Sequence, residues 1–120
     1  MTGEPLGLLP FVPGGPHFQL SRDLFHELGF QELWANEGYV GLQHGAAKFI
    51  LQDLDNGAFA GNLMVRIDVP DLEAWWRRIE AMNLASRFPS FRIKPPITYP
   101  WGREVHFIDL AGVCWHVGEP

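Results

Sequence analysis

The chain has 120 residues, a formal charge of −5 and a single cysteine, Cys114. A chain of this length builds one hydrophobic core, its acidic charge disfavours nucleic acid as a partner, and a lone cysteine excludes an internal disulfide. It has no apolar run of the roughly 20 residues that a membrane span needs, and it has no basic segment at its start that would indicate a secretory signal. We therefore expect a cytoplasmic protein.

The first half of the chain predicts the order strand, helix and three strands. An apolar run over residues 6–12 ends at a Pro-Gly-Gly-Pro break and predicts the first strand. We expect a helix over about residues 17–28, because Gly29 stands where a helix commonly ends in the left-handed conformation. Three strands are expected next, over residues 30–35, 39–44 and 48–52.

The second half predicts the same order after a linker over residues 53–61. A strand is expected over residues 63–69, and Asp71 is placed to cap a helix that ends near residue 82. A weak strand is expected over residues 91–93. The chain then closes with a hairpin of residues 104–108 and 113–117, joined by a four-residue loop that opens with Asp109 and closes on Gly112.

These patterns predict a single α+β domain over residues 1–120, built from two similar βαβββ modules of about 1–54 and 62–120. Each module forms a half-barrel sheet with one face under its own helix, which leaves the other face concave and partly apolar. Because large apolar patches rarely stay exposed on a monomer, we expect a homodimer that completes a cleft between sheets.

Three motifs along the chain resemble the vicinal-oxygen-chelate superfamily (glyoxalases, bleomycin-resistance proteins and dioxygenases), most closely its bleomycin-resistance branch. They are Leu-Phe-His-Glu-Leu-Gly-Phe at 24–30, Gly-Tyr-Val-Gly-Leu-Gln-His-Gly at 38–45, and the final hairpin that begins Pro-Trp-Gly-Arg-Glu at 100–104. The resemblance implies a dimer that binds a cationic, aromatic antibiotic of the bleomycin type in clefts at the subunit boundary, without modifying it.

Metal enzymes of this superfamily hold a divalent ion with His, Glu or Gln at four inward strand positions. The equivalent places in this chain are near Leu9, Ile50, Met64 and His116, so three of the four are apolar. A shift of the alignment would bring in Gln52, but one imidazole cannot hold a catalytic ion. We therefore expect no metal and no cofactor.

The resemblance also assigns ligand-binding positions. Trp34 and Tyr39 resemble aromatic groove residues, Trp101 with Gly102 resembles the start of the final hairpin, and His116 faces the concave side, opposite Trp115. The predicted ligand-binding set is Trp34, Tyr39, Asn62, Met64, Arg66, Trp101, Gly102 and His116. Arg66 departs from the pattern, since some bleomycin binders have a groove tryptophan near that position and a guanidinium would favour an anionic ligand.

The two histidines of the final hairpin do not meet in this prediction. If Ile108 pairs with Val113, then His106 lies opposite Trp115 and the two rings point to opposite sides of the sheet. The leading hypothesis is thus a drug-binding protein without catalytic residues. The alternatives are a metal-dependent glyoxalase or dioxygenase-type enzyme, and a ligand-sensing or structural dimer with no role in resistance.

Overall fold

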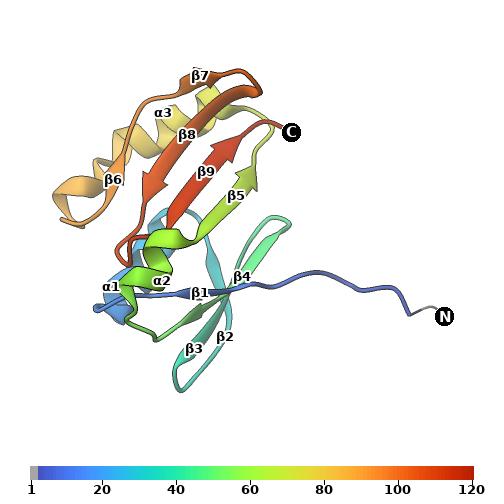
Figure 1. Cartoon of the computed structure of the whole chain (residues 1–120), viewed down its shortest axis with the longest axis vertical. Helices are drawn as coiled ribbons and strands as arrows, with labels where there is room; N and C mark the ends of the chain where they lie inside the picture. The colour runs from blue at the N-terminus through green and yellow to red at the C-terminus, as the bar shows by residue number, and fades with distance from the viewer. Residues whose placement is uncertain (1–2) are drawn as a thin grey trace.

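The computed structural model describes residues 3–120, so the first two residues of the predicted domain lie outside the described part (Figure 1). Its elements are β1 (Phe11–Pro13), α1 (Phe18–Glu27), β2 (Gln31–Asn36), β3 (Tyr39–His44), β4 (Ala47–Gln52), α2 (Gly57–Asn62), β5 (Met64–Asp68), α3 (Leu72–Met82), a 3-10 turn η1 (Leu84–Ser86), β6 (Arg92–Ile93), β7 (Ile97–Tyr99), β8 (Gly102–Ile108) and β9 (Cys114–Gly118). Among the described residues, no helix is long and apolar enough to cross a bilayer.

The first sheet has the order β1-β4-β3-β2, with β1 parallel to β4 and the other pairs antiparallel. Helix α1 covers one face of it through Phe25, whose ring makes edge contacts with Phe30 and Phe49. Side chains alternate between the two faces of a strand, so every second residue of these strands points away from α1. We call this face, opposite α1, the open face of the first sheet.

The second sheet has the order β5-β9-β8-β6, with β7 also pairing with β8. Helix α3 lies against its inner face, where Trp75 stacks on Phe107 at a centroid distance of 6.3 Å. Asp71 caps this helix as predicted, with its side chain accepting a hydrogen bond from the N–H of Ala74. Figure 1 shows α3 on one side of β8 and β9, and the other side is the open face of the second sheet.

Trp115 joins the two halves into one core. It is 1% exposed, and its indole contacts the rings of Phe25 and Phe49 from the first half and stacks on Phe107 in the second. The predicted α+β fold with two unclosed half-barrel sheets, each covered by its own helix, is confirmed.

The predicted register of the final hairpin is wrong by one residue. Ile108 pairs with Cys114 and not with Val113. The N–H of Asp109 donates to the carbonyl of Val113, and this hydrogen bond closes a turn of three residues, 110–112. Gly112, the last of them, adopts a left-handed φ of 102°. Since alternate residues of a strand point to opposite faces, this shift exchanges the faces that meet across the hairpin.

Three other segments differ from the prediction. The first strand begins at Phe11. The apolar segment before it forms no strand, although the carbonyl of Pro10 accepts a hydrogen bond from the N–H of Ile50, and Leu6 and Leu8 are fully or largely exposed. The predicted linker contains helix α2, which Asn56 caps by accepting a hydrogen bond from the N–H of Phe59. Strand β7 lies in a proline-rich passage where no strand was expected. It forms because it pairs with β8, a distant contact that the local sequence does not indicate.

Candidate functional site

The predicted ligand-binding residues lie in two groups on different sheets. Trp34 and Tyr39 lie on the open face of the first sheet, and the remaining six lie on or beside the open face of the second sheet. Within one chain the predicted residues therefore form two separate groups, which we call the two half-sites of the candidate site.

On the first sheet, aromatic side chains lie flat or edge-on over the open face. Trp34 lies across Gly41, so closely that a Cβ at that position would stand 2.4 Å from the indole Nε1. The ring of Phe11 meets that of Tyr39 edge-on at 5.9 Å. All three aromatic residues are more than a third exposed, which leaves their faces available for stacking.

On the second sheet, Trp101 is 68% exposed and stacks on Tyr99 with a centroid distance of 5.0 Å and an interplanar angle of 7°. Gly102 follows with a φ of 138°, a conformation that favours glycine and lets the chain turn directly into β8. Tyr99 in turn stacks on His106 at 5.3 Å. The three rings form a continuous aromatic platform that begins in solvent and ends over the sheet.

The other predicted residues of this half-site have different roles. Met64 is 69% exposed on β5, whereas the side chain of Asn62 turns back to donate a hydrogen bond to the carbonyl of Ala58 in α2. Arg66 donates to Asp68 at 2.8 Å and also to Glu104. Its positive charge is therefore balanced within the chain by two carboxylates, which weakens the expectation that Arg66 favours an anionic ligand.

Glu104 lies at the centre of this half-site and was not among the predicted residues. Its side chain is 4% exposed, yet it accepts hydrogen bonds from the indole N–H of Trp101 at 2.9 Å, from His106 at 2.8 Å and from His116 at 3.2 Å. The Trp-Gly-Arg-Glu motif was the signal that could have identified it, since a carboxylate three residues after the tryptophan reaches its indole nitrogen.

Burial raises the pKa of the Glu104 carboxyl, but the hydrogen bonds from His106, Trp101 and His116 and the charge of Arg66 outweigh burial and lower it to about 2. Glu104 is therefore an anion at any physiological pH. Because a carboxylate only accepts hydrogen bonds, each imidazole nitrogen that contacts it carries the N–H of its ring.

The corrected register brings the two histidines together. His106 and His116 are directly opposite each other on β8 and β9, with ring centroids 4.0 Å apart. The prediction that they point to opposite faces is wrong, because it rested on a hairpin loop one residue too long. Cys114 lies on the same face, and one potential ligand atom from each of these three residues lies within 4.8 Å of the others.

Two hollows on this face share Glu104. A polar hollow of about 300 Å³ brings together the predicted residues Arg66, Trp101 and Gly102. A second hollow of about 440 Å³ lies across β8 and is lined by Tyr99, His106, Cys114 and Glu104, with Arg92 and Lys94 also contributing to its wall. Together they provide aromatic surfaces beside a buried anion.

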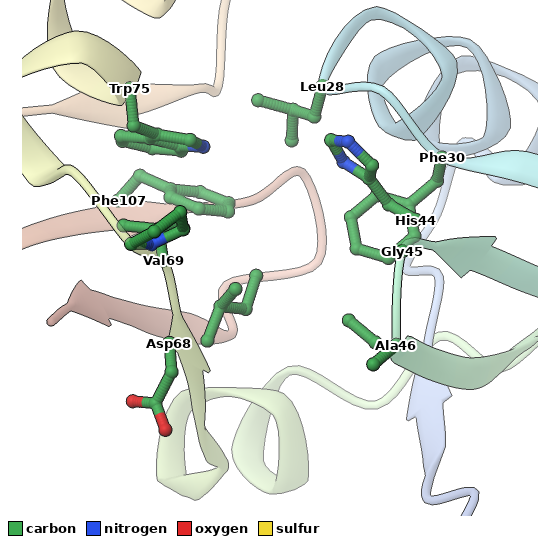
Figure 2. Close-up of a pocket in the computed structure, with 12 residues that line it drawn as sticks. Leu28, Phe30, His44, Gly45, Ala46, Asp68, Val69, Trp75 and Phe107 are labelled. Carbon is green, nitrogen blue, oxygen red and sulfur yellow. The ribbon is translucent and has the colours of Figure 1, made fainter. Parts of the chain in front are cut away.

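A separate cavity of about 290 Å³ lies between the two halves on the helix side of the sheets. Figure 2 shows Trp75 and Phe107 on one wall and Leu28, Phe30 and His44 on the other. Its lining is mostly apolar and its polar side chains do not converge, so we place the candidate site on the open faces instead.

No known family profile matches the chain, and no curated protein sequence matches it. Solved structures do. A bleomycin-binding protein from bleomycin-producing Streptomyces verticillus, complexed with copper(II)-bleomycin, superposes with a TM-score of 0.81 at 20% identity, covering 99% of both chains. A bleomycin resistance determinant encoded on the transposon Tn5 gives a TM-score of 0.75 at 21% identity, covering 92% of this chain and 94% of that one. A lactoylglutathione lyase from Agrobacterium tumefaciens gives 0.66 at 16% identity, covering 96% and 94%.

Proposed function

Because the chain has the fold of these bleomycin-binding proteins and of the lactoylglutathione lyase, we propose that it is a homodimeric, non-enzymatic protein that sequesters a cationic aromatic antibiotic of the bleomycin type. The observation that carries the proposal is the Tyr99–Trp101 stack beside the buried anion Glu104. An exposed indole whose orientation is fixed by its N–H bond to Glu104 offers a stacking surface for a flat heterocycle. The formal charge of −5 on the chain attracts a cationic ligand at long range.

Dimerisation is part of the proposal, because the two half-sites lie on different sheets of one chain. Their open faces expose large apolar side chains that a single chain does not cover: Phe11, Trp34, Tyr39, Met64, Ile97 and Trp101. The extended N-terminal segment also carries exposed leucines and projects away from the body of the molecule (Figure 1). Such patches mark association surfaces, so we place Trp34 and Tyr39 of one protomer opposite the second sheet of its partner.

Titration calorimetry with metal-free bleomycin tests this proposal. We expect binding with a micromolar or lower Kd and two ligands per dimer, with analytical ultracentrifugation showing the dimer before the drug is added. A monomer at tens of micromolar protein would contradict the shared cleft. A dimer that releases no heat with bleomycin would contradict the assignment of bleomycin as the ligand. The proposal of a dimer that binds another small molecule would then still stand.

The second candidate function is a metal-dependent enzyme of the glyoxalase or dioxygenase type, and the meeting of His106 and His116 is the observation that favours it. Against it, Ile50 and Met64 occupy two of the positions where metal enzymes of this fold class carry ligands. Lactoylglutathione lyase assays with added divalent metal separate the two candidates, since only the enzyme would turn over the hemithioacetal of glutathione and methylglyoxal.

A further inference from the structure

We propose that His106, Cys114 and His116 form a binding site for Zn²⁺ on the open face of the second sheet. The metal site can be tested apart from the proposed drug binding because it needs only one sheet of one chain, although His116 also belongs to the predicted ligand-binding set and the cluster lies beside the same hollow. It also differs from the four positions at which the resemblance placed metal ligands, of which it shares only His116.

The sheet register sets the three residues in order. Counting along the open face, Glu104 lies one row before the pair His106 and His116, and Cys114 lies one row after that pair, opposite Ile108. The histidine pair therefore has a carboxylate on one side and a thiol on the other. One ligand atom from each of the three candidate ligands already lies within 4.8 Å of the others.

The hydrogen bonds of Glu104 prepare the histidines for a metal. Its Oε1 accepts from Nε2 of His106 at 2.8 Å and from Nδ1 of His116 at 3.2 Å. In the neutral imidazoles, the lone pairs are then on Nδ1 of His106 and Nε2 of His116. A carboxylate that holds the far N–H of a metal-binding histidine is the usual outer-shell partner of such ligands, because it fixes the tautomer and the orientation of the ring.

Neither lone pair has a strong partner among residues 3–120. Nε2 of His116 is buried without a hydrogen bond to any described residue, although buried polar atoms are rarely left unpaired. Nδ1 of His106 meets only the hydroxyl of Tyr99, at 3.5 Å. An orphaned, buried imidazole nitrogen beside a second imidazole and a thiol provides donor atoms that a metal ion would satisfy.

The donor set selects the cation. Two imidazole nitrogens and one sulfur suit Zn²⁺ and do not suit Mg²⁺ or Ca²⁺, which take oxygen ligands. With metal–ligand bonds of about 2.0 to 2.3 Å, tetrahedral ligands stand roughly 3.3 to 3.8 Å apart, so the three side chains need to close by about 1 Å. The Cys114 thiol loses its proton to solvent on binding, and water takes the fourth position.

The test is titration of the purified full-length chain with Zn²⁺ alone by calorimetry, and with Co²⁺ as a spectroscopic substitute. We expect one metal per chain, visible d–d bands of tetrahedral intensity and a sulfur-to-cobalt charge-transfer band. Cys114→Ser should abolish the charge-transfer band, and Cys114→Ser and His116→Gln should each weaken Zn²⁺ binding by more than about 100-fold, since loss of an outer-shell partner alone costs 10- to 100-fold.

His17→Gln is the matched control, because His17 is an exposed histidine at the start of α1 and outside the cluster. Circular dichroism checks that each variant is folded. Because Cys114→Ser and His116→Gln are tested as separate proteins, the misfolding of one of them still leaves the other as a test. Octahedral Co²⁺ spectra, unchanged affinity in a folded Cys114→Ser variant, or loss of binding in His17→Gln would overturn the site. Because no drug is present, these outcomes leave the proposed antibiotic binding untouched.

Discussion

His106 and His116 stand directly across the ladder between β8 and β9, with their ring centroids 4.0 Å apart and a single oxygen of Glu104 bonded to both. This arrangement links the stability of the second sheet to the charge of one buried carboxylate. It also places the aromatic platform, the anion and the proposed metal ligands within one small surface.

The stability of the protein should fall in acid because of Glu104. The folded pKa is about 2 against an ordinary value of 4.5, so the ionised carboxylate stabilises the fold above about pH 4.5, and this contribution disappears as the pH falls toward 2. A paired carboxylate of this kind contributes on the order of a few kcal/mol at neutral pH. Urea denaturation at pH 7, 4 and 3 should show that Glu104→Gln is less stable at pH 7 and that the gap to the parent chain closes in acid.

Glu80→Gln is the control for this experiment, since Glu80 lies exposed on α3. Its stability should follow that of the parent chain at every pH. A constant gap between Glu104→Gln and the parent from pH 7 to pH 3 would contradict the assigned role of the charge.

Removal of the exposed indole of Trp101 should weaken bleomycin binding while the protein stays folded, although Glu104 loses one of its hydrogen-bond donors. Trp101 is 68% exposed, so its loss removes a stacking surface without opening a cavity. We expect Trp101→Ala to bind metal-free bleomycin at least about 10-fold more weakly, because stacking of this kind contributes on the order of 1 to 3 kcal/mol. The exposed ring of Phe59 on α2 provides the control, and Phe59→Ala should bind like the parent chain.

A methyl group at residue 41 should disturb the half-site on the first sheet. The Cβ of Gly41→Ala would stand 2.4 Å from the indole of Trp34, so the indole must move off the sheet. Since Trp34 is 40% exposed, it can move without unfolding the protein, and the expected loss is in dimerisation or drug binding, measured by ultracentrifugation and calorimetry. Gly57→Ala, where a Cβ meets nothing within 4 Å, should leave both unchanged; equal behaviour of the two variants would exclude Trp34 from the interface.

The turn of the final hairpin should depend on the Asp109 side chain. Its Oδ1 accepts the N–H groups of Ala111, Gly112 and Val113, and its Oδ2 accepts the indole N–H of Trp115 at 2.8 Å. Burial raises the pKa of this carboxyl, and the four donors oppose that rise. Asp109→Ala leaves the buried donors of Val113 and Trp115 unpaired and should lower the free energy of unfolding by about 2 to 4 kcal/mol.

Asp109→Asn separates the two ends of the carboxylate in the same denaturation experiment. Its amide oxygen can still serve the backbone N–H groups, but its NH₂ then faces the donor of Trp115. An intermediate loss of stability is therefore expected, and an alanine variant as stable as the parent chain would show that the turn does not need the carboxylate.

Local patterns in the sequence determined most of the elements, because each signal lies within a few residues. Asp71 predicted the start of α3, the Pro-Gly-Gly-Pro break marked the end of the first strand, and Gly29 marked the end of α1 with its left-handed φ of 106°. The paired order of the elements, together with the family resemblance, was likewise sufficient to predict two unclosed half-barrel sheets.

Only the tertiary structure decided the chemistry of the open face. A strand exchanges its two faces with every residue of shift, so the pairing of His106 with His116 depended on whether the turn has three residues or four. That choice is made by the Asp109 carboxylate and its buried donors, which the strand pattern does not encode. Likewise, Glu104 becomes a buried anion only because Trp101, Arg66 and two histidines from three strands and a loop converge on it, and such convergence exists only after the chain has folded.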